Sequence, residues 1–322
     1  MTSLTNPATL VGRVLISTRA ELAATARDAV GGSSGDVWVG FVPTMGALHA
    51  GHASLIQAAA QQRDQQQHRA CRKVIVSIFV NPAQFAPSED FDCYPRDLAA
   101  DYALAVENGA DYIFAPDVRE IYPHYPQLLL PDQQQLRPSL VARRWEGQAR
   151  PGHFEGVVTV VKRLFDLVKP DHAYFGEKDF QQLRVIEDMT AQLQLPTKIV
   201  RCHTVRDATG LALSSRNRHL SAAEKNAATS IPRALHAVGD AVRAATETLA
   251  VAPLLQAARM LLDDSISVDY LAIVDQHSLE PLTQLTVTND AATEAAIDPK
   301  TGARIMFAGQ LGSVRLLDNL PL

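Results

Sequence analysis

Apolar residues between positions 37 and 204 follow two spacings that alternate along the chain. Lys73–Val80 is an almost unbroken apolar run, typical of a central parallel strand covered on both faces. Gly156–Lys169 has apolar residues at the i, i+3, i+4, i+7 spacing of an amphipathic helix. The same patterns predict strands over Val37–Val42, Asp111–Ala115, His172–Phe175 and Thr197–His203, and helices over His52–Gln67, Leu98–Asn108 and Phe180–Leu193. Strands that alternate with helices predict right-handed βαβ units in an open parallel sheet.

The pattern changes after residue 204. Ser221 and Glu224 fit a capping box that opens a long Ala-rich helix, and a second helix has Pro253 near its first turn. Strand candidates follow at Ser267–Val274, Arg304–Ala308 and Ser313–Leu317. We therefore expect an α/β protein with a Rossmann-like domain over residues 1–204 and a smaller C-terminal α+β domain over residues 205–322.

Two segments show no periodicity. Tyr122–Gln148 carries several prolines, and we interpret it as either an irregular excursion or a lid. Thr286–Gly302 is rich in Thr, Asn, Asp, Pro and Gly, which favours an exposed loop.

Composition narrows the class of protein. With 47% hydrophobic and 20% charged residues, the 322-residue chain has the composition of a soluble globular protein. A formal charge of −5 and few aromatic residues argue against a nucleic-acid or acidic-membrane partner. The cysteines Cys71, Cys93 and Cys202 form no CxxC pair, which favours a reducing compartment. Because residues 1–13 resemble no secretory signal and no apolar run could span a bilayer, we expect a cytoplasmic enzyme.

The candidate chemistry begins where the strand Val37–Val42 gives way to a helix. His49-Ala50-Gly51-His52 places two imidazoles one helical turn apart, with glycines nearby. A glycine-containing turn at a helix N-terminus presents unpaired backbone N–H groups, which suit an anion such as phosphate. Two histidines at this spacing also occur by chance. A metal site is a further alternative, although no third ligand stands nearby in the sequence.

Neutral amides follow the second strand. Asn81 and Gln84 stand just after Lys73–Val80 and would supply hydrogen bonds to a polar substrate without adding charge. The alternative is a simple strand cap and turn, which Asn-Pro alone favours.

Charged groups follow the strand His172–Phe175. Gly176-Glu177-Lys178-Asp179 is either a charged surface turn or a loop that aims Lys178 at phosphate across the sheet edge. Gln182 lies one helical turn beyond Lys178 and shares its face. Further along the chain, Ser214-Ser215-Arg216 is either a phosphate clamp or an interdomain linker whose arginine pairs with an acid.

Together these motifs resemble the pantothenate synthetase family, whose members join pantoate to β-alanine with ATP. The resemblance runs in order through Pro43–His52, Val80–Phe85, Tyr94–Asp97, Arg150–Phe154, Phe175–Asp179 and Ser214–Asn217, and extends to Arg315–Asn319. It implies a sheet of the HxGH nucleotidylyltransferase type, ATP as a substrate with Mg²⁺, no tightly bound organic cofactor, and a homodimer. Leu213 stands where the family usually has methionine, and nothing is transferred onto residues 126–144 or 286–302.

The resemblance also implies roles for individual residues. His52 would donate a hydrogen bond or a proton to the departing phosphate, and His49 would assist it. Lys178 and Arg216 would neutralise developing charge. The implied ATP-binding residues are Met45, Gly46, Ala47, Leu48, His49, Ala50, Gly51, His52, Gly176, Glu177, Lys178, Asp179, Val205, Leu213, Ser214, Ser215 and Arg216.

The other substrates are assigned to amide side chains. Gln84 and Gln182 would hold pantoate, with Gln84 also near β-alanine, while Asn81 would support the reacting groups. Asp92 and Asp97 could touch magnesium, although their spacing is not diagnostic. His153 could touch substrate, but we favour a structural histidine that caps the helix beginning near Gly156.

Two other functions remain open at this point. A nucleotidylyltransferase would use the same phosphate-binding groups and stop at nucleotide transfer. A nucleotide-binding protein without catalysis would keep the fold, but the intact His49, His52, Lys178 and Arg216 argue against it.

Overall fold

The computed structural model describes residues 15–28, 37–66, 69, 71–85, 91, 94–128, 137–286 and 302–322. Asp92, Cys93 and almost all of Thr286–Gly302 lie outside the described residues, as does the middle of the segment 126–144. Among the residues described, no helix is long and apolar enough to cross a membrane.

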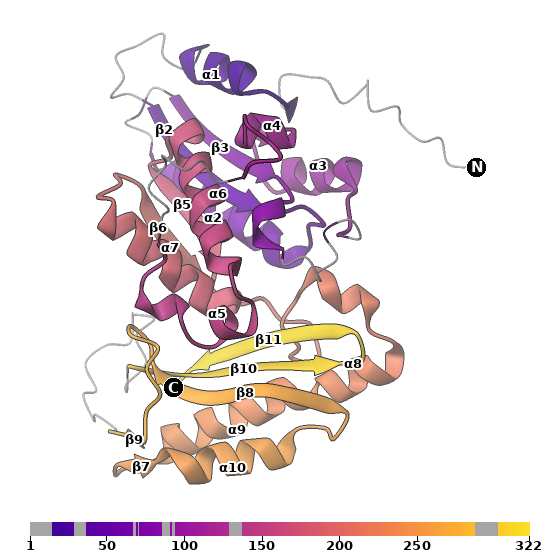
Figure 1. Ribbon diagram of the computed structural model, residues 1–322, viewed down its shortest axis with the longest axis vertical. Helices are drawn as coiled ribbons and strands as arrows, with labels where there is room; N and C mark the ends of the chain where they lie inside the picture. The colour runs from indigo at the N-terminus through magenta and orange to yellow at the C-terminus, as the bar shows by residue number, and fades with distance from the viewer. Residues whose placement is uncertain are drawn as a thin grey trace.

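Six parallel strands form the larger sheet, in the order β1-β4-β3-β2-β5-β6 (Figure 1). Their bounds are β1 Leu15–Ile16, β2 Val37–Thr44, β3 Cys71–Ile78, β4 Tyr112–Phe114, β5 His172–Gly176 and β6 Lys198–Cys202. The order of the strands reverses between β2 and β5, which pair in parallel through Gly40 and Phe41. In open α/β sheets, ligands bind at this reversal, beyond the carboxyl ends of the strands.

Helices cover both faces of this sheet. They are α1 Arg19–Asp28, α2 Ala50–Gln65, α3 Leu98–Glu107, α4 Val118–Ile121, α5 Glu146–Ala149, α6 His153–Val168 and α7 Phe180–Gln192, with 3₁₀ turns η2 Pro82–Gln84, η3 Leu140–Ala142 and η4 Glu177–Asp179. Adjacent residues of β2 face opposite cores, because side chains alternate along a strand. Phe41 packs with α6 and α7, whereas Val42 packs with α2 and α3.

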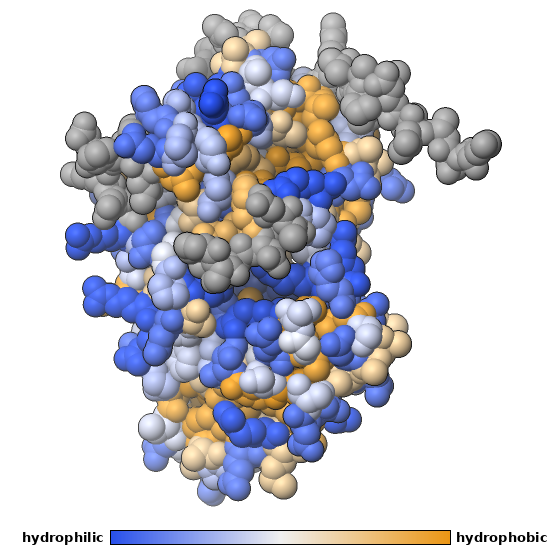
Figure 2. Space-filling view, turned by 45° about the vertical axis from the view of Figure 1, so that its right-hand side comes forward, coloured by the Kyte–Doolittle hydropathy of each residue, from blue (hydrophilic) through white to orange (hydrophobic). Residues whose placement is uncertain are grey.

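The C-terminal part of the chain is built around a three-stranded antiparallel sheet with the strand order β11-β10-β8. The elements of this part of the chain are η5 Ser215–His219, α8 Ala222–Ala228, α9 Ser230–Ala244, β7 Leu249–Ala250, α10 Val251–Leu261, β8 Ile266–Asp275, β9 Gln284–Leu285, β10 Ala303–Leu311 and β11 Val314–Pro321. β7 and β9 pair with each other in a separate two-stranded sheet. Figure 1 shows α9 and α10 on the side of the three-stranded sheet away from the parallel sheet. Phe307 packs against those helices, and the adjacent Met306 packs into the core of the larger part. Hydrophilic residues gather across the middle of the face in Figure 2, between these two parts.

The structure confirms the predicted fold class and most of the predicted elements to within a few residues, and it adds β1, α1, α4, β7 and β9, which the pattern did not predict. Two of the predictions differ from the structure. The long helix expected after Ser221 is two helices, α8 and α9, separated at Thr229. Pro232 explains the break, because proline lacks an N–H and its ring clashes with the carbonyl four residues earlier. The capping box is present, with Ser221 Oγ accepting from Glu224 N at 3.2 Å and Glu224 Oε2 accepting from Ser221 N at 2.8 Å.

The second difference concerns Tyr122–Gln148, which the sequence indicated to be either an irregular excursion or a lid. Its described part contains η3 and α5. Gln181 Nε2 of α7 donates to the carbonyl oxygens of Val141 at 2.7 Å and Arg144 at 2.8 Å. These bonds tie the end of the segment to α7, which packs on the parallel sheet. This end is therefore held against the body of the protein.

Candidate active site

A cleft of about 220 Å³ lies beyond the carboxyl ends of β2 and β5. Residues 43–45 and 174–176 contribute from the strand ends, and residues 203–205 and 213–216 contribute from the segment that leads to the second sheet. The apolar stripe of α6 forms a further wall through Val157, Val160, Val161 and Leu164. The sequence pattern predicted an amphipathic helix here, and the structure shows that its apolar stripe lines the cleft.

Asp101 of α3 fixes the backbone of the loop after β2. Asp101 Oδ2 accepts from Ala47 N at 2.9 Å, and Oδ1 accepts from Leu48 N at 2.6 Å. Gly46 has φ +87°, and a Cβ there would lie 2.9 Å from Asp101 Oδ2, so this turn requires glycine. Burial raises the pKa of Asp101, and the two backbone bonds oppose that shift. Asp101 was not predicted as a site residue; the signal in the sequence was its place one turn before Ala105 on the buried face of α3.

The two motif histidines cap each other. His49 Nδ1 accepts from Gly51 N at 3.1 Å, and His52 Nδ1 accepts from His49 N at 3.3 Å. Since Nδ1 is the acceptor in both neutral rings, each proton resides on Nε2. The ring centroids are 4.2 Å apart.

Burial keeps both imidazoles neutral. It lowers the pKa of His49 to about 4, with help from the positive charges of Lys178 and Arg218. It lowers the pKa of His52 to about 3, with a further contribution from His49. At neutral pH the pair therefore offers two Nε2–H hydrogen-bond donors. This arrangement favours hydrogen bonding to phosphate over the proton donation that an unperturbed histidine would allow.

Asn81 is fully engaged with its own surroundings. Its Nδ2 donates to Gln84 Oε1 at 2.9 Å and to Gly156 O at 3.1 Å. Its Oδ1 accepts from Tyr122 OH at 2.7 Å and from Ala83 N at 3.2 Å. Because the donors and acceptors of this amide are occupied, Asn81 is positioned to orient Gln84, which lines the cleft, rather than to contact reacting atoms.

Neighbouring side chains of the loop after β5 point in two different directions. Lys178 lines the cleft and pairs with Asp179, with Lys178 Nζ 3.2 Å from Asp179 Oδ1. Burial acts to raise the pKa of Asp179, but the charges of Lys178 and Arg216 hold it below its usual range. Glu177 points the other way and pairs with Arg304 of β10 at 3.3 Å. Gln182, on α7, faces the cleft beside Lys178.

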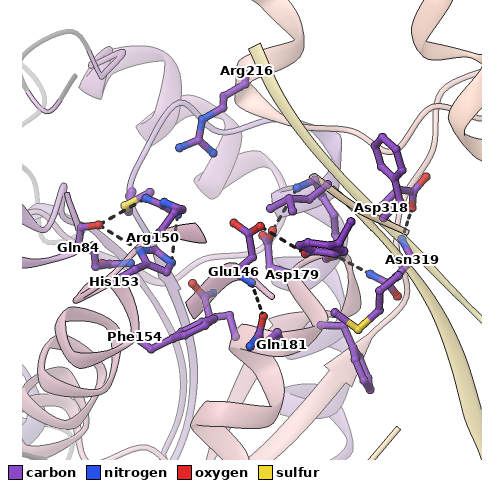
Figure 3. A pocket seen from close by; sticks show the side chains of 18 of the residues that line it. Gln84, Glu146, Arg150, His153, Phe154, Asp179, Gln181, Arg216, Asp318 and Asn319 are labelled. Carbon is purple, nitrogen blue, oxygen red and sulfur yellow. Dashed lines mark hydrogen bonds and ion pairs between the residues drawn. The ribbon is translucent and has the colours of Figure 1, made fainter. Parts of the chain in front are cut away.

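The serine and arginine segment closes the cleft from the other side. Ser214 Oγ accepts from Arg216 N at 3.3 Å and so caps η5. The guanidinium of Arg216 forms no hydrogen bond or ion pair with any side chain in the described part of the chain, and Arg216 lines the cleft. It also lines a smaller pocket beside the cleft, and Figure 3 shows its side chain reaching toward that pocket. The sequence alternative, a linker arginine paired with an acid, is therefore not what the structure shows. Arg206 is the residue of this segment that makes such a pair, with Asp318 at 2.7 Å.

The structure brings most of the expected site residues to one cleft. Those that line it are Met45, His49, Gly51, His52, Gln84, Gly176, Lys178, Asp179, Gln182, Val205, Leu213, Ser214, Ser215 and Arg216. Gly46, Ala47, Leu48, Ala50, Glu177 and Asn81 are not among the described lining residues. Gly46, Ala47 and Leu48 instead shape the loop that carries the histidines.

The described residues do not provide a ready-made metal centre. No group of three or more His, Cys, Asp or Glu side chains that could hold a metal ion occurs among them. Asp97, one of two acids considered for magnesium, caps α3 by accepting from Ala100 N at 3.0 Å. Asp179 is a carboxylate inside the cleft, already paired with Lys178. These groups fit a magnesium ion that enters together with a nucleotide better than one held by the protein alone.

A parallel sheet with an HxGH loop and a lysine loop at its strand reversal defines a nucleotide-binding α/β enzyme. The chain belongs to the pantoate-beta-alanine ligase family, whose sequence profile matches residues 14–321. It is 44% identical over 284 residues to the pantothenate synthetase of Nocardioides sp., covering 88% of this chain and 78% of that protein. It is 46% identical to the pantothenate synthetase of Rhizorhabdus wittichii, covering 88% of this chain and 90% of that protein.

Solved structures agree with this assignment. The pantothenate synthetase of Thermus thermophilus superimposes with a TM-score of 0.79 at 40% identity, covering 96% of this chain and 99% of that chain. The pantoate-beta-alanine ligase of Francisella tularensis, complexed with beta-gamma ATP and beta-alanine, superimposes with a TM-score of 0.67 at 30% identity. That match covers 96% of this chain and 97% of the Francisella chain.

Proposed function

We propose that this chain joins pantoate to β-alanine in an ATP-dependent reaction that releases AMP and pyrophosphate. One observation carries the proposal: the HxGH pair, Lys178, Arg216 and the amides of Gln84 and Gln182 line a single cleft at the strand reversal. Family membership and the ligands of the Francisella relative support the same substrates.

In the first step, the pantoate carboxylate attacks the α-phosphate of ATP. The new phosphorus–oxygen bond gives pantoyl adenylate, and the bond to the β-phosphate breaks with its electrons on pyrophosphate. Because the carboxylate is already a nucleophile, this step needs no protein base. The Nε2–H groups of His49 and His52, with Lys178 and Arg216, stabilise the charge that develops on the phosphates. A preorganised donor of this kind contributes about 3 kcal/mol to the transition state.

The nucleotide fits along the wall that joins the two sheets. Val205 and Leu213 provide an apolar surface for the base, while Ser214 and Ser215 provide donors for the phosphates. Met45, Gly51, Gly176 and Asp179 complete this wall. Magnesium arrives with ATP and neutralises part of the charge on its β- and γ-phosphates.

Pantoate fits between the two glutamines. Gln84 and Gln182 supply neutral hydrogen bonds to its hydroxyls and carboxylate, and Asn81 fixes the rotation of the Gln84 amide. In the second step, the amine of β-alanine attacks the acyl carbon and the mixed anhydride bond breaks with its electrons on AMP. One amine proton is released as the amide forms. Holding both reactants in one cleft makes this step effectively unimolecular.

We also propose the domain division that the sequence indicated, with residues 1–204 and 205–322 as units that close on the adenylate and exclude water. A homodimer is proposed on the family resemblance, and a cytoplasmic location on the cysteine pattern, which favours a reducing compartment. Light scattering coupled to gel filtration tests the dimer.

The decisive assay measures AMP and pantothenate from ATP with both pantoate and β-alanine, and with each omitted in turn. Formation of both products only when both substrates are present supports the ligase. A stable nucleotide-linked product without amide formation would indicate a nucleotidylyltransferase instead. ATP binding by folded protein without any turnover would indicate a nucleotide-binding protein.

A further inference from the structure

A second groove, here called the outer groove, meets the active-site cleft at the histidine loop. Its volume is about 520 Å³, and it is lined by His49 and by residues from the segment 207–229. His49, Leu213 and Ser214 line both the outer groove and the cleft, so these three side chains form the border. His49 and Ser214 are also groups that we expect to contact phosphates. The outer groove is therefore open to the phosphate end of a nucleotide in the cleft.

Two exposed cations, Arg218 and Lys225, line the outer groove. Neither side chain forms a hydrogen bond or an ion pair with any other residue that the structure describes. Because a 3₁₀ helix has three residues per turn, Arg216 and Arg218, two positions apart on η5, project to different sides. Arg216 lines the cleft, and Arg218 lines the outer groove. The turn thus supplies one arginine to each space.

Among the residues described, one acid lines the outer groove, and it is already engaged. Asp207 Oδ1 accepts from Thr209 N at 2.8 Å, from Thr209 Oγ1 at 2.6 Å and from Leu211 N at 3.1 Å. These bonds hold the carboxylate against its own loop and compensate part of its charge. With two cations and one engaged acid, the described lining of the outer groove has a net positive charge, which favours an anionic ligand.

The cleft itself offers little positive charge to a polyphosphate. His49 and His52 are neutral at pH 7, because their pKa values are about 4 and about 3. Lys178 is paired with Asp179, which leaves Arg216 as the unpaired cation among the described lining residues. Arg218 is the next cation beyond the border. Burial is the main cause of the low pKa of His49, and the charges of Lys178 and Arg218 add to it, so the field of Arg218 reaches the border of the cleft.

The outer groove and the glutamines meet the cleft through different residues. Gln84 and Gln182, which we expect to hold pantoate, also line the smaller pocket beside the cleft. In the part of the chain that the structure describes, no residue lines both that pocket and the outer groove. In an in-line displacement, the leaving group departs on the side opposite the nucleophile. Pyrophosphate that leaves opposite pantoate therefore moves away from the glutamines, toward the border formed by His49 and Ser214.

We propose that the outer groove receives the terminal phosphates of ATP and is the path by which pyrophosphate leaves, with Arg218 and Lys225 as its cations. The proposal rests on the ligase function proposed above and adds a phosphate subsite to it. AMP and the adenylate lack these terminal phosphates, so they are held by the cleft alone. Arg218 consequently acts on ATP and on pyrophosphate but not on AMP.

The test measures Kd for ATP, pyrophosphate and AMP by calorimetry in the presence of Mg²⁺. We expect Arg218→Gln to weaken binding of ATP and of pyrophosphate by about 5- to 10-fold, a modest loss because solvent screens an exposed cation. Its affinity for AMP should be unchanged. In pantoate-dependent exchange of pyrophosphate into ATP, KM for pyrophosphate should rise by the same factor. Both differences should shrink as ionic strength rises.

Further variants separate charge from shape. Arg218→Lys keeps the charge and should retain most of the affinity for ATP. Lys225→Gln should show the same dependence on the ligand, and the double variant with Arg218→Gln should show the largest loss. Arg259→Gln, which removes an exposed cation from α10 outside the outer groove, is the matched control.

The outcomes are separable. An equal loss of affinity for AMP and ATP in Arg218→Gln would overturn the proposal, because the substitution would then act on the whole cleft. Unchanged affinity for ATP and pyrophosphate, or an equal loss in Arg259→Gln, would also overturn it. A native protein that binds ATP and pyrophosphate with the predicted dependence on Arg218, but catalyses no pantoate-dependent exchange, would support the subsite and contradict the ligase function. Thermal unfolding of each variant separates loss of folding from loss of binding.

Discussion

The loops after β2 and β5 both face the cleft, but they are held in place by different parts of the molecule. The loop after β2 is supported by its own layer, through Asp101 of α3 and the reciprocal caps of His49 and His52. The loop after β5 is supported by the second sheet. Asn319 of β11 donates through Nδ2 to Glu177 O and to Lys178 O, both at 2.9 Å.

The contacts between β11 and the loop after β5 belong to a buried network of side chains. Asn319 Oδ1 accepts from Arg304 Nη1, and Arg304 pairs with Glu177 and lies 3.8 Å over the ring of Phe180. Burial lowers the pKa of Arg304 to about 10, although the carboxylate of Glu177 opposes the shift. From this difference we infer that the histidine loop is preformed by the parallel sheet. The backbone that carries Lys178 instead contacts the second sheet, so we expect the position of this lysine to depend on contact between the two sheets.

The largest effect should come from removing a charge or a donor from either loop. We expect Lys178→Ala and His52→Ala each to lower the rate of AMP formation by roughly 100- to 1,000-fold, because each removes a preorganised contact to the phosphates. Steady-state AMP release measures this. His236→Ala, at an exposed position on α9, is the control. A native rate in either variant would remove that loop from the mechanism.

A smaller effect should follow from removing only the hydrogen bonds between Asn319 and the loop after β5. We expect Asn319→Ala to lower kcat by roughly 10- to 100-fold and to reduce Tm, since it removes the side-chain donor from the carbonyls of Glu177 and Lys178. Asn319→Asp keeps an acceptor for Arg304 but cannot donate to those carbonyls. It should therefore lose as much kcat as the alanine variant. Full activity of Asn319→Asp in the same assay would show that the carbonyl contacts do not position Lys178.

Removing one of the hydrogen bonds between Asp101 and the loop after β2 should act mainly on nucleotide binding. Asp101→Asn keeps one acceptor oxygen but loses the second, so one of the Ala47 and Leu48 amides is left unpaired. We expect KM for ATP to rise by about tenfold with a smaller change in kcat. Kinetics with ATP as the varied substrate test this. A change confined to KM for pantoate would be inconsistent with a role in the histidine loop.

The smallest expected effect is on the pH dependence of stability. The pKa values of His49 and His52 fall from 6.5 to about 4 and about 3 in the folded protein, so the unfolded chain binds more protons below pH 6.5. Stability from these groups is therefore present above pH 6.5 and is lost as pH falls toward the folded values. Urea unfolding between these limits should show a shallower pH dependence in His49→Gln. An identical slope in the native protein and the variant would contradict the neutral, buried state of this ring.

The sequence predicted features that depend on neighbours in the chain. The HxGH turn, the α6 stripe and the Ser221 capping box follow from local spacing. Asp101 and Asn319 were not assigned roles, because their partners lie 54 and 142 residues away. Nothing local distinguishes Asn319 from any polar residue near the end of a strand. Glu177 was grouped with its lysine neighbour as an ATP ligand, and only the arrival of Arg304 from β10 shows why its side chain turns away.

The most direct test of the contrast between the loops measures ATP affinity and single-turnover adenylate formation in Asn319→Ala and Asp101→Asn. The two substitutions should impair different steps, ATP binding in one variant and adenylate formation in the other. We predict that Asn319→Ala binds ATP with nearly native Kd but forms pantoyl adenylate slowly, because Lys178 is misplaced. Asp101→Asn should bind ATP weakly and, once saturated, form the adenylate at close to the native rate. If both variants lose affinity and rate in the same proportion, the two loops are not separately supported and the account is wrong.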